Sequence, residues 1–291
     1  FYSSRVIYSL LFNLILGFAY LGLSIIIFKY HRLWLPLIDV ELAIIFTFTL
    51  SAYISYITEG QKKKYLKIAM GRYLSPVVVD LIVQNPDKIE LGGDEYQGTV
   101  FFSDIKNFTT ISEKYPPKEL INYLNNYLTE CTDIVLKNNG MLDKFIGDAI
   151  MAIFGAPINT GNHAYQACKT ALEIHHNITK AYLNSNNGDK PVFVTRIGLN
   201  SGDFILGNVG NKNRLEYTAI GDTVNLASRL EGVNKEFGTN IIMSESTYCM
   251  VKDLVIAREL DYIKVKGKTK PIKIYELVSL NDDKIDTTYI D

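Results

Sequence analysis

Residues 99–109 have the sequence TVFFSDIKNFT, in which an apolar run is followed directly by an aspartate and a polar segment. The β-branched and aromatic residues at 99–103 predict a short strand, so Asp104 stands at a strand end. The following residues lead into a helix, whose free backbone N–H groups at its start can bind phosphate. Phe108 and Thr109 are therefore candidate substrate-binding residues.

A second aspartate lies in a predicted hairpin. Residues 141–154 (MLDKFIGDAIMAIF) indicate two strands joined at Gly147-Asp148. Adjacent strands would bring Asp104 and Asp148 to one edge of a sheet. Both are thus candidate ligands for Mg²⁺, which prefers oxygen donors. Two such ions about 4 Å apart activate an attacking oxygen and stabilise the leaving one. Spacing alone leaves open that each aspartate only caps a local turn.

The sequence from 92 to 280 alternates between predicted strands and helices, which indicates one domain of the α+β or α/β class. Pro116-Pro117 opens a helix that ends near Gly140, and Asp222 is expected to cap a helix that ends at Gly238. Residues 281–291 are polar and expected to form a loose tail. A further helix is expected at 163–182, and further strands at 193–199, 215–220, 262–265 and 272–278.

The composition excludes some classes of protein. The chain of 291 residues is 47% hydrophobic and 21% charged, which is not typical of disordered or collagen-like sequences. Its formal net charge is -1, so charge gives no basis for binding nucleic acid, and no nucleic-acid partner is expected.

Two long apolar stretches lie near the N-terminus. Residues 6–28 contain no charged side chain and would form a helix of roughly 34 Å, enough for a hydrocarbon core of roughly 30 Å. A second stretch covers 37–57, so residues 1–57 are predicted to be a membrane region in contact with lipid. Lys62-Lys63-Lys64 follows, and positive charge favours the cytoplasmic side. We expect a multi-pass protein of the inner (plasma) membrane, with the remaining chain cytoplasmic. Because the chain begins with Phe1, we also expect sequence upstream.

Residues 58–91 are predicted to form a helical linker that Pro76 interrupts. Its apolar face has two compatible interpretations. The helix packs onto the following domain, or it pairs in parallel with the same helix of a second chain. The positions that share this face are Tyr65, Leu66, Ala69, Met70, Tyr73 and Leu74.

Asn225 and Arg229 lie four residues apart on the helix predicted at 223–237, so they face the same way. An amide and a guanidinium on one face could hold a ribose and a phosphate during a transfer reaction. The alternative is an ordinary solvated polar face.

Four segments together resemble the class III nucleotidyl cyclases: VFFSDIKNFT (100–109), DKFIGDAIMAIFG (143–155), RIGLNSG (196–202) and YTAIGDTVNLASRLE (217–231). The resemblance extends over about Gly92 to Val278 and implies a ferredoxin-like βαββαβ catalytic domain. The two apolar stretches and residues 70–90 also resemble bacterial membrane cyclases with an upstream CHASE-type sensor.

The resemblance implies a role for each matched residue. Asp104 and Asp148 would bind two Mg²⁺ or Mn²⁺ ions, with the Ile105 carbonyl as an additional ligand. Lys144 and Thr218 would recognise the base. The catalytic residues would be Asn225, which orients the ribose, and Arg229, which stabilises the transition state, and the phosphates would be held by Arg196 and Lys266.

Sites of this family form between two head-to-tail domains, so the resemblance implies a homodimer with ATP as its substrate partner. One chain would supply Asp104, Asp148 and Arg196, and the other Lys144, Thr218, Asn225, Arg229 and Lys266. The expected activity is that of an adenylyl cyclase, which converts ATP to 3′,5′-cyclic AMP and pyrophosphate. Lys144 can donate to adenine N1, which lacks a hydrogen, whereas guanine N1 carries one. The alternatives are a guanylyl cyclase and a catalytically silent receptor or scaffold.

Gly92-Gly93-Asp94-Glu95-Tyr96 resembles the GGDEF signature of diguanylate cyclases. In that family the motif belongs on a hairpin after the metal-binding strand, whereas here it precedes the strand that ends at Asp104. We therefore expect a turn before the first strand and no catalytic role.

Overall fold

The computed structural model describes residues 2–71, 78–79, 91–184, 191–211, 213–264 and 271–281. The chain divides into two compact units, residues 1–73 and 74–291. Each unit is described by itself.

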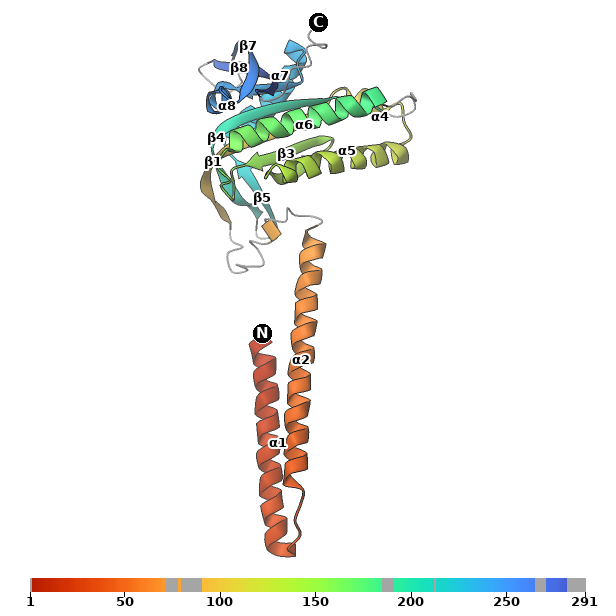
Figure 1. Ribbon diagram of the computed structural model, residues 1–291, viewed down its shortest axis with the longest axis vertical. Helices are drawn as coiled ribbons and strands as arrows, with labels where there is room; N and C mark the ends of the chain where they lie inside the picture. The colour runs from red at the N-terminus through yellow and green to blue at the C-terminus, as the bar shows by residue number, and fades with distance from the viewer. Residues whose placement is uncertain are drawn as a thin grey trace. The chain divides into compact units, whose positions relative to one another are not determined.

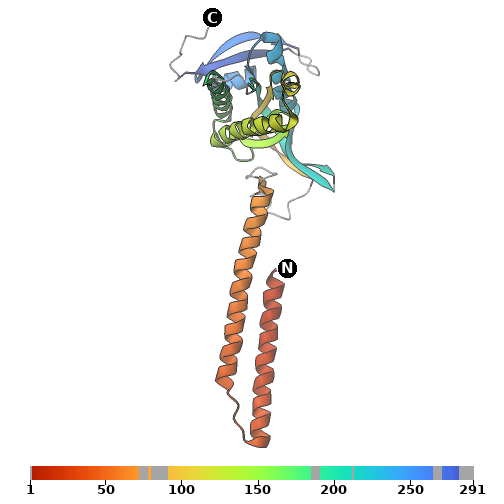
Figure 2. The same cartoon turned by 90° about the vertical axis from the view of Figure 1, so that its right-hand side faces the viewer.

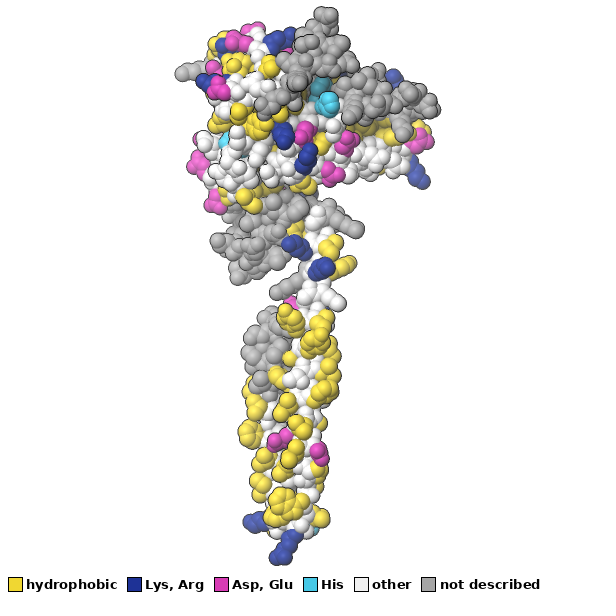
Figure 3. Space-filling model, in the orientation of Figure 1, with side chains coloured by type: hydrophobic (Ala, Val, Ile, Leu, Met, Phe, Trp, Pro, Cys, Tyr) yellow, Lys and Arg dark blue, Asp and Glu magenta, His cyan; other side chains and the backbone are white. Residues whose placement is uncertain are grey.

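The first unit is a pair of long helices, α1 (Tyr2–His31) and α2 (Leu37–Met70), that lie side by side (Figure 1). The Phe28 and Trp34 rings pack edge to face near the connection between them. Hydrophobic side chains cover the outside of this unit, as Figure 3 shows, and Phe18 is 70% exposed. Leu11–His31 and Leu37–Lys62 are long and apolar enough to cross a membrane. Length and composition thus agree with the two predicted spans.

Helix α2 continues without a break beyond the predicted end of the second span. Its 34 residues correspond to roughly 51 Å, which exceeds a hydrocarbon core of roughly 30 Å. Of the predicted linker face, Tyr65 and Met70 lie on α2. Tyr73, Leu74 and Pro76 lie outside the described residues.

The second unit is built on an eight-stranded sheet among the described residues, in the order β2-β3-β1-β4-β6-β8-β7, with β5 paired to β4. Among the first four strands, each neighbouring pair is antiparallel, and their order is the one expected for a βαββαβ core. The predicted ferredoxin-like α+β fold is therefore confirmed. The elements are β1 (Gly92–Ile105), α4 (Phe108–Ser112), α5 (Pro117–Lys137), β2 (Met141–Ile146), β3 (Ala149–Phe154), α6 (His163–Asn184), β4 (Thr195–Asn211), β5 (Arg214–Ile220), α7 (Asp222–Phe237), β6 (Ile241–Ser244), α8 (Glu245–Val251), β7 (Val255–Ile263) and β8 (Ile272–Leu280).

Side chains alternate across β1, and this alternation separates the core from the site. Phe101 and Ile105 are fully buried in the core formed with α5 and α6, which lie side by side on that face (Figure 1). Phe102 belongs to the opposite face, where it packs in the cluster that includes Ala227 of α7. Asp104, two residues after Phe102, therefore lies on the α7 side of the sheet.

Gly198 of β4 allows α7 to lie close to the sheet. A Cβ at this position would collide with the backbone of Ala227 and Glu231. The absence of a side chain therefore brings one face of α7 against the strand that carries Arg196. This contact sets the position of every α7 side chain discussed below.

The predicted turn at residues 92–96 is wrong, because these residues form the first part of β1. They pair with residues 204–208 of β4, which extends well beyond its predicted end at 199. Gly207 lies so close to Gly92 and Gly93 that no Cβ fits there. The two glycines of the motif thus serve close backbone pairing. Figure 2 shows this end of β1, β4 and β5 projecting from the rest of the unit.

Other boundaries also differ from the prediction. Helix α7 begins at Asp222 itself, with Gly221 at the cap position, whereas the stop at Gly238 is confirmed by its left-handed backbone. The strand expected at 262–265 is β7, which begins at Val255. The sequence patterns did not predict β6 or α8.

Candidate active site

Asp104 and Asp148 are neighbours, as the sequence predicts. Asp104 lies at the end of β1, and Asp148 lies in the β2–β3 turn, where Gly147 has the left-handed conformation (φ 67°). The Ile105 N–H donates to Oδ2 of Asp148 over 3.3 Å. Burial, and then the negative charge of Asp104, raise the pKa of Asp148 to about 6. The fold thus places two carboxylates side by side at one sheet edge.

Arg196 lies opposite Asp104 in the β1–β4 register. Its guanidinium forms an ion pair with Oδ2 of Asp104 at 2.7 Å. Its Nε lies 3.1 Å from Oε1 of Glu231 on α7, but the two are not aligned for a hydrogen bond. Burial and the negative charge of Asp104 raise the pKa of Glu231 to about 7. In this structure Arg196, predicted to hold phosphate, is paired with two carboxylates.

The oxygen donors here fit a hard divalent cation. Asp104 and Asp148 repel each other, and a cation beside them would relieve that repulsion. No group of three acidic, histidine or cysteine side chains suited to a metal ion occurs among the described residues. The remaining ligands would then be backbone carbonyls, water molecules or substrate phosphates. Mg²⁺ is often bound in this way, by one or two carboxylates together with water and phosphate oxygens.

The two predicted base-recognising residues lie close together around a third residue. The Thr218 hydroxyl on β5 donates to Oδ2 of Asp143 on β2 over 2.8 Å. Nζ of Lys144 lies 3.7 Å from the same oxygen and 2.7 Å from Oε1 of Glu216. The structure thus brings Lys144 and Thr218 together and adds Asp143, whose side chain is fully buried.

Asn225 and Arg229 lie on a different side of α7 from the aspartate pair of their own chain. At ~100° per residue, Arg229 and Glu231 are separated by roughly 160° around the helix axis. Ala227 and Leu230 are buried, whereas Asn225 is exposed. Arg229 makes no ion pair or side-chain hydrogen bond with any residue that the structure describes. The two polar side chains are thus turned away from Asp104.

The remaining predicted residues contribute less to the visible site. The Phe108 ring packs against Phe193 in the core, with ring centroids 6.2 Å apart, so only its backbone is available for phosphate. Thr109 is exposed on the short helix α4. Lys266 lies outside the described residues.

Comparison with known proteins identifies the domain. Residues 94–279 match the family described as "Adenylate and Guanylate cyclase catalytic domain". The chain belongs to this family. The family predicted from the four sequence segments is thereby confirmed, and the second unit is a cyclase domain.

Curated and solved relatives agree with this assignment. The chain is 39% identical to "Adenylate cyclase 1" of Rhizobium meliloti over 62% of its own length, but only over 27% of that protein. Its structure resembles the adenylyl cyclase CyaB from P. aeruginosa, with a TM-score of 0.60 and 36% identity, covering 66% of this chain and 99% of that one. It also resembles the guanylate cyclase domain of RhGC from Catenaria anguillulae in complex with GTP, with a TM-score of 0.56 and 34% identity, covering 64% and 99%.

Sequence reasoning missed two carboxylates of the cyclase domain. Glu231 ends the fourth quoted segment, two residues after Arg229, and Asp143 begins the second, immediately before Lys144. Neither follows from periodicity. Glu231 can be recognised as part of the site only when α7 is known to pack beside Arg196. Asp143 can be recognised only when the irregular pairing of β2 is known.

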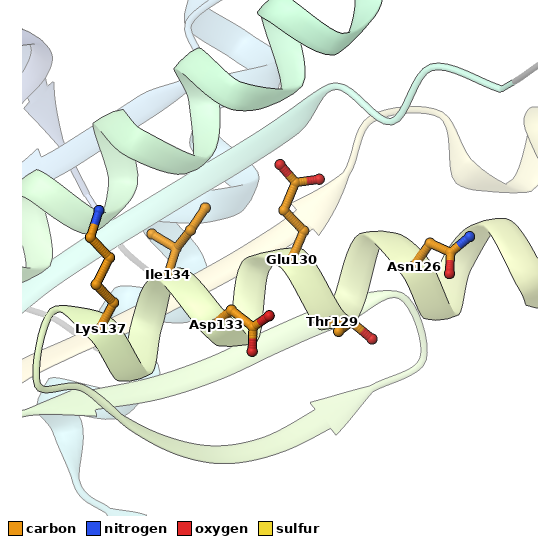
Figure 4. A pocket seen from close by; sticks show the side chains of 6 residues that line it. All are labelled: Asn126, Thr129, Glu130, Asp133, Ile134 and Lys137. Atoms are coloured by element: carbon orange, nitrogen blue, oxygen red, sulfur yellow. The ribbon is translucent and has the colours of Figure 1, made fainter.

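A shallow surface hollow also occurs on the cyclase domain, and all its lining side chains come from α5 (Figure 4). None of the predicted site residues lines it, so we assign no part of the cyclase reaction to this hollow. Its lining residues are Asn126, Thr129, Glu130, Asp133, Ile134 and Lys137.

Proposed function

We propose that this chain is a membrane-anchored adenylyl cyclase that converts ATP to 3′,5′-cyclic AMP and pyrophosphate in a homodimer. The observation that supports ATP most directly is the Lys144–Thr218 pair around Asp143, in a domain that also carries the aspartate pair. Relatives of both base specificities resemble this chain, so overall similarity does not decide the base.

Hydrogen-bond chemistry favours adenine. The Lys144 ammonium has only donors, and adenine N1 is an acceptor, whereas guanine N1 carries a hydrogen. Two donors facing each other in a part-buried site leave both unsatisfied, which is costly. Guanylyl cyclases typically carry glutamate where this chain has Lys144. This difference argues for ATP over GTP.

In the proposed reaction, the ribose 3′-oxygen attacks the α-phosphorus in line and pyrophosphate leaves. Asp104 and Asp148, with the Ile105 carbonyl, would hold two Mg²⁺ or Mn²⁺ ions. Bound divalent ions supply a lowered pKa for the 3′-hydroxyl and neutralise phosphate charge. The Arg229 guanidinium donates to the α-phosphoryl oxygens as their charge grows, an interaction of the transition state. Asn225 orients the ribose, and Arg196 and Lys266 hold the phosphates.

The placement of α7 supports a site made by two chains. Asn225 and Arg229 face away from Asp104 of their own chain, so one chain alone does not bring these groups together. In a head-to-tail homodimer, Asp104, Asp148 and Arg196 of one chain would meet Lys144, Thr218, Asn225, Arg229 and Lys266 of the other. A symmetric arrangement of this kind has two equivalent sites.

The two-helix unit supports membrane anchoring. Its exposed apolar side chains and its two candidate spans suit a lipid environment. Lys62-Lys63-Lys64 follows the second span, so we place the cyclase domain in the cytoplasm and the helices in the inner (plasma) membrane.

A product assay tests the proposal. The purified full chain is incubated with ATP or GTP and Mg²⁺ or Mn²⁺, and cyclic nucleotides are quantified. We expect cyclic AMP and pyrophosphate, with ATP preferred when both nucleotides compete. Preferential cyclic GMP would show a guanylyl cyclase. Nucleotide binding without any cyclic product would show a silent receptor or scaffold.

A further inference from the structure

Asp143 occupies an irregular position in β2. In the pairing of β2 with β3, Leu142 lies opposite Ala152 and Lys144 lies opposite Met151, so Asp143 is the extra residue of a β-bulge. In a regular strand, two consecutive side chains would point to opposite faces. The bulge instead turns both toward the same place, since Oδ2 of Asp143 lies 3.7 Å from Nζ of Lys144.

The environment of Asp143 is unfavourable for a carboxylate. Its side chain has no exposed surface. Burial raises its pKa to about 6, whereas the Thr218 hydrogen bond and the Lys144 charge lower it. Burial of a carboxylate is costly, so packing alone gives no reason for an aspartate here.

The hydrogen bond to Asp143 determines what Thr218 can offer a ligand. A hydroxyl has one hydrogen to donate and two lone pairs that accept. Thr218 uses its only hydrogen on Oδ2 of Asp143, at 2.8 Å, because an ionised carboxylate only accepts. The Thr218 oxygen is therefore left as an acceptor. Adenine presents the N6 amino donor, whereas guanine presents the O6 acceptor.

We infer that Asp143 is a positioning residue for base selection: it orients the Thr218 hydroxyl so that the Lys144–Thr218 pair presents one donor and one acceptor, matching adenine and not guanine. This inference rests on the proposed adenylyl cyclase activity. Without the carboxylate, the Thr218 hydroxyl turns freely and donates to guanine O6 as readily as it accepts from adenine N6.

The experiment measures kcat/KM of the full chain for ATP and for GTP, with the ratio of the two as readout. We expect Asp143→Ala to lower the ATP-to-GTP ratio about tenfold, the scale of one lost polar contact in recognition. Thr218→Val, which removes the hydroxyl, should lower the ratio similarly. The double variant should fall no further than Thr218→Val, because Asp143 acts through that hydroxyl.

The readout separates positioning from structural damage. Loss of folded protein lowers both rates equally and leaves the ratio unchanged. If Asp143→Ala does not fold, Asp143→Leu removes the acceptor while filling the space. Glu130→Gln is the matched control, because Glu130 is an exposed glutamate of α5 that contacts neither Lys144 nor Thr218, and it should not lower the ratio.

Three results would overturn the inference. They are an unchanged ratio in both Asp143 variants, additive effects of Asp143→Ala and Thr218→Val, or an equal fall in Glu130→Gln. A wild-type enzyme that prefers GTP, or makes no cyclic AMP, would instead overturn the proposed function, and the inference with it. The wild-type measurement therefore distinguishes the two failures.

Discussion

At the scale of single residues, the aspartate pair combines a functional requirement with an electrostatic cost. Asp104 and burial together raise the pKa of Asp148, so in the absence of a cation the two charges oppose each other. A neutral amide at either position would relieve this repulsion but would bind a divalent cation poorly. Stability and activity should therefore respond to Asp148→Asn in opposite directions, whereas Asp104→Asn also removes the ion pair with Arg196.

We expect Asp104→Asn and Asp148→Asn each to lower cyclic AMP formation by about 10³-fold, the scale of losing one preorganised charge-stabilising group. In metal-free buffer, Asp148→Asn should keep or raise the melting temperature. Addition of Mg²⁺ should raise the melting temperature of the wild type and not of the variants. Near-normal turnover with Mg²⁺ in either variant would show that the metal assignment is wrong.

Glu231 provides a prediction about pH. Its pKa rises from the ordinary 4.5 to about 7 on folding, so its ionisation favours the unfolded chain. Protonated Glu231 therefore makes its full contribution to the stability of the folded chain below pH 4.5, and this contribution is lost as the pH rises through 7. Glu231→Gln removes this titration. The free energy of unfolding of the Glu231→Gln variant should exceed that of the wild type by an amount that grows between pH 4.5 and 7, by on the order of 2 kcal/mol. Above pH 7 the difference should stay constant.

The measurement is thermal unfolding of the metal-free chain at several pH values. Glu236→Gln, an exposed position on the same helix, controls for the loss of a glutamate charge. An advantage of Glu231→Gln that does not change with pH would contradict the assigned role of burial.

At the scale of elements, the contact of α7 with β4 determines the geometry of the site. Gly198→Ala should push α7 away from the sheet and destabilise the cyclase domain by about 2 kcal/mol, since overpacking a close contact is costly. Gly232→Ala, on the same helix with open space around it, should stabilise by about 0.5 kcal/mol. Denaturant unfolding of the full chain in detergent measures both. Equal changes in the free energy of unfolding would mean that the missing side chain at Gly198 is not needed for the close packing of α7 on β4.

Some elements were predictable because local chemistry decides them. Pro117 opens α5, Gly238 ends α7, and Gly147-Asp148 joins β2 to β3, as turn and capping preferences indicate. The strand end at Asp104 follows from the apolar run before it. These features place each aspartate at a strand end, and the pairing of β1 with β3 then brings the two together.

Other elements depend on pairing between distant segments, which local patterns do not contain. Residues 92–96 include turn-forming glycines, yet they are a strand because β4 pairs with them. In a regular strand, the side chains of Asp143 and Lys144 would point to opposite faces of the sheet. The bulge in β2 instead brings them to the same side. Glu231 becomes part of the site through the close approach at Gly198. The missed residues are thus those whose positions depend on tertiary contacts.

At the scale of the whole molecule, the proposed membrane anchoring depends on the exposed apolar surface of α1 and α2. We expect the full chain to remain in the membrane fraction after alkaline carbonate extraction and to enter solution only with detergent, as helices of this length and composition do. Fractionation followed by immunoblotting measures this. Release by carbonate alone would contradict a spanning arrangement.

The proposed active site requires two whole molecules, because the position of Arg229 on α7 separates it from Asp104 within one chain. Asp104→Ala and Arg229→Ala homodimers should each be inactive, since both of their sites lack an essential group. When the two chains assemble together, one site of each heterodimer carries both substitutions and the other carries neither. Heterodimers purified away from both homodimers should therefore show roughly half of the wild-type activity, because one of the two sites in each symmetric dimer is complete.

The measurement is cyclic AMP formation after coexpression of the two chains with different affinity tags, so that heterodimers are purified through both. Mixing Asp104→Ala with Asp148→Ala is the control, because both groups would come from the same chain of each site. That pair should stay inactive, since every site then lacks one aspartate. Recovery in the control, or none in the Asp104–Arg229 heterodimer, would show that the site is not divided between chains in this way.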